Sequence, residues 1–378
     1  MDIIFDWYLW MFPLLGIFAY ILISKKKIYA AEHSLPNSPL NYDIADDYRV
    51  TVGFAILVFL AMILVAGFRD RWYADTTAYV NMFESWPSRF GDIKLTGEER
   101  YPGFIYFTVF IKQFISSDFR VWLVIIAAIS ILCIALTYRR YTSEIVLCAF
   151  FFFASTEFQS WTMNGIRQFM VVAIMFSLTP LLLKKKPSGI IVFIAIGLLL
   201  YFTHVSVLIA LPVYIMALGK PMNKKTLLVM GAIVLAILFI GQFSELLTDT
   251  LEGTNYESSA SEIVSDADDG TNILRVLFYS VPALLAIFFR KKIPDNAPAI
   301  INFSINMSLV GMAFYFLSFF MSGIFLGRIP IYFTLYNYIL IPWEIKMFFK
   351  KENQQLIFYG FIIVYIAFYV VQMRTWGI

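Results

Sequence analysis

The stretch GFRDRWYADTTAYVNMFESWPSRFGDIKLTGEERYPGFIYF, residues 67–107, is the first long polar interruption in a chain that is otherwise mostly apolar. It gathers arginines, carboxylates and aromatic side chains where a membrane protein normally carries a short neutral turn. We expect residues 67–103 to form an extracytoplasmic loop that contributes to an active site. The rest of the chain would hold this loop at one membrane surface.

The composition leaves lipid as the main environment of the chain. Of the 378 residues, 60% are hydrophobic and 15% are charged, with a mean hydropathy of +0.75, whereas soluble domains contain about 45–50% apolar residues. Cys133 and Cys148 both lie in apolar runs and are interpreted as buried hydrophobic side chains rather than a disulfide. We therefore predict a single all-α membrane domain over residues 1–378, with the lipid bilayer as a partner and no nucleic acid partner.

About twelve membrane-spanning helices are predicted, within a range of roughly 10–14, because a helix needs about 20 apolar residues to span. Residues 104–115 are apolar but short, and Lys112 interrupts them, which predicts a half-helix or a re-entrant segment. The run Ser188–Leu218 has a polar step in its middle and predicts a tight helix pair or a broken helix. The candidate spans are Ile3–Ile23, Val50–Gly67, Phe119–Tyr138, Glu144–Ser160, Gln168–Leu183, Ser188–Thr203, His204–Leu218, Thr226–Phe243, Ile273–Phe289, Ala299–Phe320, Pro330–Phe349 and Gln355–Met373.

Basic clusters orient these spans, because cytoplasmic loops of membrane proteins carry an excess of lysine and arginine. All the clusters are cytoplasmic at once if residues 104–115 do not cross and Ser188–Leu218 crosses twice. Both termini, the opening loop and an acidic loop at residues 244–272 then lie outside. The clusters are Lys25–Lys27, Arg139–Arg140, Lys184–Lys186, Lys224–Lys225, Arg290–Lys292 and Lys350–Lys351.

Arginines concentrate on the predicted outer side, against the insertion bias. The planar guanidinium binds phosphate oxygens through paired hydrogen bonds and stays charged when partly desolvated. A phosphate site is one interpretation, and the other is snorkelling or pairing with nearby carboxylates. Nine of the 13 arginines are on this side: Arg69, Arg71, Arg89, Arg100, Arg120, Arg167, Arg275, Arg328 and Arg374.

Carboxylates in the opening loop are candidates for a general base. Asp75 and Tyr79 are four residues apart and would share one face of a helix. Glu99 comes just before the apolar piece at residues 104–115. A carboxylate near a partly covered apolar surface serves as a base when its pKa is raised. The alternative is that Asp75 and Glu99 form ion pairs that fix the loop.

Three later positions repeat the pattern of polar residues at outer span ends. Arg167 follows Asn164 into a span, where free backbone N–H groups and a cation together make an anion site. His204, with Ser206 beside it, is an ionisable group at membrane depth, which is a functional candidate by default. Arg328 again precedes a span. The alternatives are turn closure for Arg167 and plain interhelical hydrogen bonding for His204.

Motifs for bound cofactors are missing from the sequence. There is no Gly-rich phosphate loop, no His/Cys cluster with metal-ligand spacing and no nucleophile elbow. The acidic loop does not match a calcium loop, because the spacing to its glycine is wrong and the terminal Glu is missing. We therefore expect chemistry without a cofactor or a metal.

Taken in order, these motifs resemble the EpsG family of exopolysaccharide polymerases, which are Wzy-like integral membrane proteins. The resemblance runs from about residue 67 to residue 333, and Asn-x-x-Arg-Gln followed by His-x-Ser is its most specific part. Two departures are Ala74, where glycine is usual, and Tyr101, where an acidic residue usually precedes Pro-Gly-aromatic. The motifs are Arg69 with Ala74–Thr76 and Tyr79, then Asn164–Gln168, then His204–Ser206, then Gly327–Arg328 with Tyr332–Phe333.

The resemblance implies a GT-C-like, metal-independent glycosyltransferase on the outer face of a bacterial cytoplasmic membrane. It would transfer a growing glycan from undecaprenyl diphosphate to a lipid-linked repeat unit, and a chain-length regulator protein is a candidate partner. Expected catalytic residues are His204, Asp75 and Glu99. Expected substrate-binding residues are Arg69, Tyr79, Asn164, Arg167, Gln168, Ser206, Arg328 and Tyr332. The alternatives are a lipid-linked sugar flippase, a polysaccharide ligase and an acyltransferase, and charge clustered at one face favours an enzyme over a flippase.

Overall fold

The computed structural model describes residues 50–96, 101–242, 245–246, 271–320 and 326–376. These residues form helices and no strand, which confirms the predicted all-α class. The predicted span Ile3–Ile23, most of the acidic loop and Glu99 lie outside the described residues. The main helices are α2 (Val52–Gly67), α3 (Thr76–Ser85), α4 (Pro102–Phe114), α5 (Phe119–Tyr141), α6 (Ile145–Ala154), α7 (Ile166–Ser177), α8 (Thr179–Leu183), α9 (Pro187–Leu200), α10 (Val207–Met216), α11 (Lys224–Leu238), α14 (Ile273–Phe288), α15 (Ala299–Phe320), α16 (Ile331–Thr334), α17 (Asn337–Phe348) and α18 (Lys351–Thr375).

Four helical segments of the described chain are long and apolar enough to cross a membrane. They are Phe119–Tyr141, Ile166–Leu183, Ala299–Phe320 and Lys351–Thr375. Several further apolar helices are shorter, namely Val52–Gly67, Ile145–Ala154, Pro187–Leu200, Val207–Met216 and Ile273–Phe288. The predicted total of about twelve spans therefore stays a prediction.

Two predicted spans differ from the structure because the backbone breaks within them. The run Glu144–Ser160 was expected to be one helix, but α6 ends at Ala154 and Thr156 takes a left-handed φ of 68°. One π-helical turn, η3 (Phe158–Thr162), follows. The run Pro330–Phe349 divides into α16 and α17. Hydropathy detects the apolar run, whereas these breaks depend on polar side chains that find partners inside the bundle.

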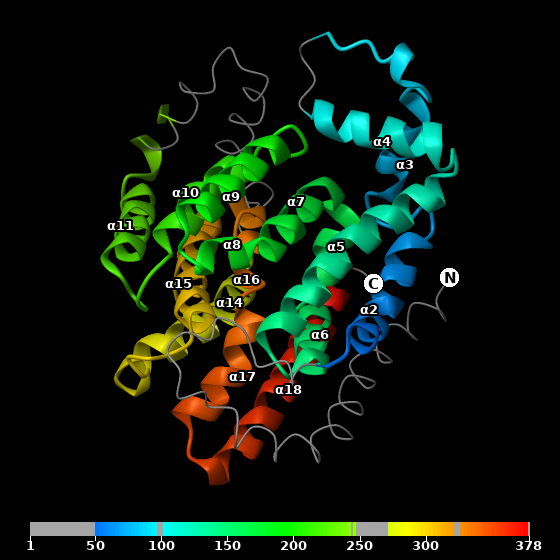
Figure 1. Ribbon diagram of the computed structural model, residues 1–378. Helices are drawn as coiled ribbons and strands as arrows, with labels where there is room; N and C mark the ends of the chain where they lie inside the picture. Colours follow the sequence, from blue (N-terminus) through cyan, green and yellow to red (C-terminus); the bar gives the residue numbers. More distant parts are fainter. Residues whose placement is uncertain (1–49, 97–100, 243–244, 247–270, 321–325, 377–378) are drawn as a thin grey trace.

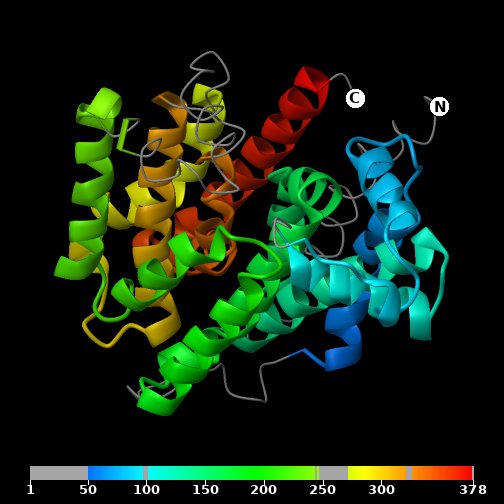
Figure 2. The same cartoon turned by 90° about the horizontal axis from the view of Figure 1, so that it is seen from above.

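Helix α15 occupies the centre of the bundle. The most apolar part of α15 is 89% buried, compared with 39% for α18. It packs against α14 and α11 along its length, and against α16 and α17 near the core. Figures 1 and 2 both place α11 on the side of the bundle away from α2. A helix buried on all sides has no amphipathic stripe, so this central position is not readable from its sequence.

Three basic side chains make contacts at one end of the bundle, which we call the lysine end. Lys292 Nζ donates a 2.5 Å hydrogen bond to the carbonyl of Phe348. Lys346 forms a 2.8 Å ion pair with Glu144 at the start of α6. Arg139 Nε, near the end of α5, donates to the carbonyl of Val50. These contacts agree with the predicted grouping of the Arg139–Arg140 and Arg290–Lys292 clusters on one side.

Helices α3 and α4 form a cap at the opposite end, which we call the arginine end (Figure 1). Phe83, Phe104, Trp122 and Met170 belong to an apolar cluster, separate from the main core, that joins α3 and α4 to α5 and α7. The segment at residues 104–115 is thus a short helix, as expected.

The run Ser188–Leu218 forms a helical hairpin, α9 and α10, which confirms the interpretation as a tight pair. The turn of this hairpin meets the start of α4, because the amide of Gly103 donates a 2.8 Å hydrogen bond to the carbonyl of Phe202. A Cβ at residue 103 would lie 3.0 Å from the Phe202 backbone, so glycine permits this close approach. The hairpin turn is therefore fixed at the arginine end, beside the cap.

The contact between α2 and α5 gives a stability prediction. A Cβ on Gly67 would lie 2.9 Å from the Cα of Val124 in α5, whereas a Cβ on Gly53 would meet nothing within 4 Å. Gly67→Ala should therefore destabilise the protein by about 1–3 kcal/mol through overpacking. Gly53→Ala is the matched control and should leave the midpoint unchanged or higher, because alanine favours the helix. Thermal unfolding in detergent measures both, and equal midpoints for the two variants would contradict the packing.

Candidate active site at the arginine end

Arg69 is fixed at the end of α2 and keeps part of its guanidinium free. Its Nε donates a 2.7 Å hydrogen bond to Thr76 Oγ1, and its Nη1 donates to the carbonyl of Ala66 at 2.5 Å. The buried Nη2 has no partner among the described residues. Burial lowers the pKa of Arg69 to about 10, so the side chain is still a cation at neutral pH. Arg69 thus presents a positioned charge with an unused donor.

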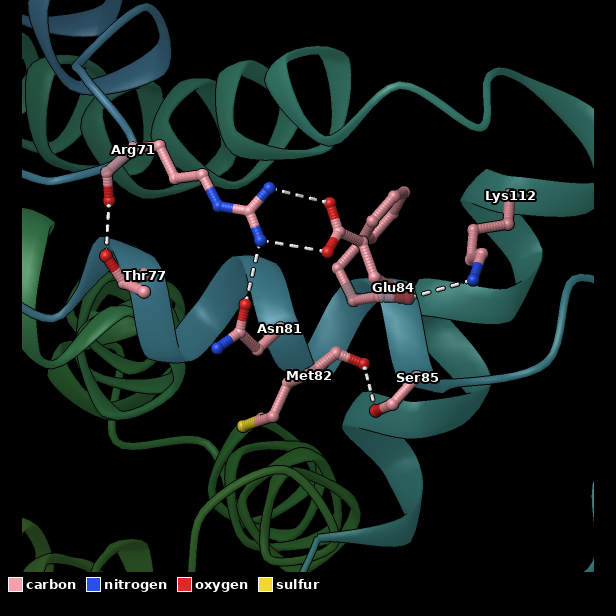
Figure 3. A network of polar contacts seen from close by, with 8 residues as sticks. Arg71, Thr77, Asn81, Met82, Glu84, Ser85 and Lys112 are labelled. Carbon is pink, nitrogen blue, oxygen red and sulfur yellow. Dashed lines mark hydrogen bonds and ion pairs between the residues drawn. The ribbon is translucent and has the colours of Figure 1, made fainter.

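Arg71, two residues further on, has a different role (Figure 3). Its guanidinium binds both carboxylate oxygens of Glu84, at 3.0 and 2.9 Å, and also Asn81 Oδ1 at 2.8 Å. Its carbonyl accepts a hydrogen bond from Thr77. Lys112 of α4 donates to the carbonyl of Phe83 nearby. The ion-pair alternative therefore holds for Arg71, whose contacts attach the loop to α3.

Asp75 lies at the start of α3 with an exposed carboxylate. Its backbone N–H faces Asn164 Oδ1 at 3.4 Å. The carboxylate forms no ion pair within the described part of the chain, so it does not brace Arg69. Tyr79 donates a 2.5 Å hydrogen bond to the carbonyl of Asn164. These contacts join the opening loop to the segment that precedes α7.

Arg167 is the second residue of α7 and stacks on an aromatic ring from α4. Its guanidinium carbon lies 3.7 Å from the centroid of Tyr101. The buried Nη1 has no hydrogen-bond partner among the described residues. Cation–π stacking holds a guanidinium without neutralising it. The Tyr101 ring thus stands beside Arg167 without offering it a counter-charge.

A chain of hydrogen bonds connects the hairpin turn to α7 and α16. His204 Nδ1 and Ser206 Oγ are 2.8 Å apart, and Ser206 Oγ lies 3.0 Å from the hydroxyl of Tyr332. Gln168 Nε2 donates to Ser206 Oγ at 3.2 Å and to the carbonyl of Arg328 at 3.0 Å. Three separate segments of sequence therefore meet around the Ser206 hydroxyl.

Arg328 ends the short helix η6 (Leu326–Arg328) and completes the group of cations. The charges of Arg167, Arg328 and Arg69 all act on the phenol of Tyr79, whose pKa burial raises above its ordinary value. None of these arginines forms an ion pair with a carboxylate among the described residues. The structure therefore brings together Arg69, Tyr79, Asn164, Arg167, Gln168, His204, Ser206, Arg328 and Tyr332, with Asp75 at the edge.

His204 is neutral in this environment. Burial in the turn between α9 and α10 lowers its pKa to about 3, and the charges of Arg167 and Arg328 act in the same direction. The backbone N–H of Ser206 is directed at Nδ1 at 3.4 Å. Because a backbone N–H only donates, Nδ1 acts as an acceptor and the ring proton resides on Nε2. The imidazole thus has an N–H donor at Nε2.

The sequence analysis missed the buried carboxylates of the bundle, among them Glu157. It lies between α6 and the π-helical turn and accepts hydrogen bonds from Tyr338, at 2.8 Å, and from Thr334. The side chain is fully buried. Its presence inside the predicted span Glu144–Ser160 was a usable signal, because carboxylates within spans mark polar centres.

The neutral imidazole of His204 gives a pH prediction. Its folded-state pKa is depressed, so below about pH 6.5 the unfolded chain binds a proton that the native state refuses. The free energy of unfolding should fall on acidification by up to about 1.4 kcal/mol per pH unit below that point. The variant His204→Asn has no titrating imidazole at this position, so its stability lacks this dependence on pH. Thermal midpoints at pH 7.5 and 5.5 should show wild type losing stability relative to the variant, and a constant difference would contradict a neutral imidazole.

Comparison with known proteins gives one match. The family model of the EpsG family matches residues 53–377 and so covers every described helix except the first residue of α2. No curated protein and no solved structure matches the chain. The match confirms the resemblance carried by Arg69, Asn164–Gln168, His204–Ser206 and Arg328. This chain therefore belongs to the EpsG family, which implies a membrane-embedded, exopolysaccharide-related polymerase of the glycosyltransferase kind.

Proposed function

We propose that this protein elongates a polysaccharide by transferring a growing glycan from an undecaprenyl diphosphate carrier to a lipid-linked repeat unit. Family membership supports the polymerase class. One observation supports a diphosphate-linked substrate. Arg69, Arg167 and Arg328 lie around Tyr79, and none of them forms an ion pair with a carboxylate among the described residues. Such a cluster is costly unless an anion binds there, and a diphosphate supplies two adjacent anionic groups.

The proposed reaction breaks one bond and forms one bond. An acceptor hydroxyl oxygen attacks the anomeric carbon of the carrier-linked glycan, and the bond from that carbon to the diphosphate oxygen breaks. The electron pair leaves with the diphosphate, where the free N–H groups of Arg69 Nη2 and Arg167 Nη1 and the charge of Arg328 stabilise it. The hydroxyl proton passes to the carboxylate of Asp75.

Asp75 is the better-supported base of the three expected catalytic residues. Its carboxylate is exposed and unpaired within the described chain, beside Asn164. His204 is neutral and has its Nδ1 occupied by Ser206, so we assign it a donor role through Nε2 toward a substrate oxygen. A catalytic role for Glu99 stays a prediction, because this residue lies outside the described chain.

The other expected substrate-binding residues are assigned a positioning role. The hydroxyl of Tyr79 donates its hydrogen bond to the carbonyl of Asn164. Gln168 Nε2 donates to Ser206 Oγ and to the carbonyl of Arg328. Tyr332 is fully buried and contacts Ser206. These neutral hydrogen bonds set where the three arginines and His204 stand, so they support catalysis through other groups.

The membrane setting belongs to the same proposal. The lysine end would face the cytoplasm and the arginine end the outer side of a bacterial cytoplasmic membrane, following the positive-inside bias. We further propose about twelve spans, a GT-C-like arrangement, arginine-based catalysis that needs no metal, and a chain-length regulator as partner. Two observations on the described chain support a bundle with two different ends. Lys292 and Arg139 make their hydrogen bonds at the lysine end, and Gln168 contacts the carbonyl of Arg328 at the arginine end.

A lipid-linked sugar flippase is the second candidate, and buried charge within the bundle is the observation in its favour. Glu157 is fully buried, and its charge acts on Arg275 of α14. Glu157 is, however, held by Thr334 and Tyr338 on two neighbouring helices, as in a fixed structural centre.

Incubating purified protein with lipid-linked repeats separates the candidates. A ladder of dimers and longer glycans supports polymerase, whereas sugar lipid in the opposite leaflet without a ladder supports flippase. Transfer of finished polymer to another acceptor supports a ligase, and an acylated product supports an acyltransferase.

The arginine assignment is tested by neutral substitutions. Arg167→Gln and Arg328→Gln should each lower the initial rate of ladder formation about a hundredfold, which is the usual cost of removing one preorganised donor to a developing anion. The same cells should accumulate single lipid-linked repeats. Initial rates with purified protein in detergent provide the measurement.

Arg71→Gln is the matched control, because this arginine is used on Glu84 and Asn81. An exposed ion pair of this kind is worth less than about 1 kcal/mol, so its rate should stay within about twofold of wild type. Normal polymer length for both Arg167→Gln and Arg328→Gln would refute the diphosphate assignment.

The base assignment is tested with Asp75→Asn, which preserves size and removes the charge. The rate should fall by about 10²–10⁴, the usual contribution of a general base. Asp70→Asn is the control, since the Asp70 carboxylate only accepts a hydrogen bond from the backbone N–H of Trp72 in the exposed loop. Equal rates for the two variants would move the base role away from Asp75.

A further inference from the structure

A second polar centre surrounds the π-helical turn η3 between α6 and α7. The backbone enters it through Thr156, whose φ of 68° is rare for a β-branched residue. A single π-helical turn adds a residue to the helix and often marks a functional site. The turn supplies Gln159, Trp161 and Thr162, and α14 supplies Arg275. We call these four residues the π-turn cluster.

The π-turn cluster contains several buried polar atoms that lack a partner among the described residues. They are Gln159 Oε1, Trp161 Nε1, Thr162 Oγ1 and Arg275 Nε. The side chains of the first three residues are 5%, 7% and 3% exposed, so the bulk solvent does not satisfy these atoms. Each buried group without a hydrogen bond destabilises the folded state. So many in one turn indicate a place that a ligand completes.

The mixture of free atoms identifies the chemistry of that ligand. Gln159 Nε2 is used on the hydroxyl of Tyr369 at 3.1 Å, so its Oε1 is left as a free acceptor. Trp161 Nε1 and Arg275 Nε are donors, and Thr162 Oγ1 does both. The ionised diphosphate diester of a lipid-linked glycan has only acceptors at neutral pH and leaves Gln159 Oε1 unsatisfied. Sugar hydroxyls donate and accept, and so match all four.

The surroundings of Arg275 also suit a sugar. Arg275 Nη2 donates to Ser160 Oγ at 3.4 Å, so part of its guanidinium already has a neutral partner. Aromatic rings of Tyr279, Trp161 and Trp376 lie 5.7, 5.9 and 6.0 Å from the guanidinium carbon. Such rings offer apolar faces for the C–H groups of a sugar.

The π-turn cluster adjoins the proposed diphosphate site. The amide of Gly165 donates to the carbonyl of Trp161 at 3.2 Å, and a Cβ at residue 165 would lie 3.3 Å from Trp161 Cε3. Asn164 and Arg167 flank Gly165 in the sequence, so the two sites share one short segment. Trp376 is 37% exposed and extends the cluster toward the surface of the bundle.

We propose that Gln159, Trp161, Thr162 and Arg275 form a subsite for a neutral sugar residue of the glycan, next to the residue that reacts. This inference rests on the proposed polymerase function and deepens it. The diphosphate and the sugar are then recognised by separate groups, a cluster of arginines without ion pairs for the one and a polar and aromatic cluster for the other.

Binding of a delipidated glycan tests the subsite. The probe is the oligosaccharide released by mild acid from lipid-linked repeats of cells that lack the polymerase. Trp161→Phe keeps an aromatic ring but removes the N–H donor together with part of the indole, and Thr162→Val replaces the hydroxyl by a methyl group at nearly the same volume. Each should raise the Kd for the oligosaccharide about tenfold in isothermal titration calorimetry, with Kd for undecaprenyl diphosphate unchanged within twofold. Thr162→Val guards against misfolding of the tryptophan variant, and thermal midpoints report folding of both.

The outcomes separate the inference from the function. If wild type extends lipid-linked repeats but both variants bind the oligosaccharide as tightly as wild type, water alone satisfies the cluster and the inference is overturned. If wild type forms no ladder yet the variants lose oligosaccharide binding, the subsite stands and the polymerase proposal fails. The two sugar sources are distinguished by kinetics. A raised KM for a soluble oligosaccharide acceptor assigns the subsite to the acceptor, whereas a raised KM for the lipid-linked donor alone assigns it to the growing chain.

Discussion

The gathering of the positive charges of Arg69, Arg167 and Arg328 around the phenol of Tyr79 is the constraint on which the arginine end depends. Like charges in a partly buried setting raise the free energy of the folded state. No described carboxylate offsets them by an ion pair. Neutral contacts position these residues instead: Thr76 Oγ1 accepts a hydrogen bond from Arg69, the Tyr101 ring stacks on Arg167, and Gln168 fixes the backbone carbonyl of Arg328. A charge held by neutral contacts remains available to an incoming anion, which a salt bridge would not allow.

The two polar centres of the molecule follow opposite designs. At the arginine end the cations form no ion pair with a described carboxylate, and burial keeps His204 neutral, with the charges of Arg167 and Arg328 acting in the same direction. Around the π-helical turn, the buried atoms without a described partner belong mostly to neutral side chains, those of Gln159, Trp161 and Thr162. In our proposals the first centre would select an anion and the second hydroxyl groups. A lipid-linked glycan, the substrate that we propose, has both in one molecule, joined at the carbon that would react.

The sequence allowed the convergence at the arginine end to be predicted, but not the second centre. Lysine placement sorted the span ends into two sets, and Arg69, Asn164, Arg167, His204 and Arg328 all fell into one set. The closeness of these five residues could therefore be predicted from the topology alone. The π-helical turn could not be predicted, because residues 144–160 are apolar enough to indicate an unbroken helix. What breaks it is Glu157, whose bonds to Thr334 and Tyr338 require segments about 180 residues away in the chain.

The two departures from the family pattern have physical explanations in the structure. Ala74 adopts a φ of 50°, a left-handed conformation in which glycine is free of strain and alanine costs about 1 kcal/mol. The usual glycine is therefore a requirement of the turn that presents Asp75, and Ala74 maintains the same turn at a small loss of stability. Tyr101 replaces an acidic residue, and its ring lies 3.7 Å from the guanidinium carbon of Arg167. A carboxylate there would neutralise Arg167, whereas a ring holds it and leaves its charge. With no acid at residue 101, the mechanism that we propose relies on the carboxylate of Asp75, which forms no ion pair among the described residues, to accept the proton.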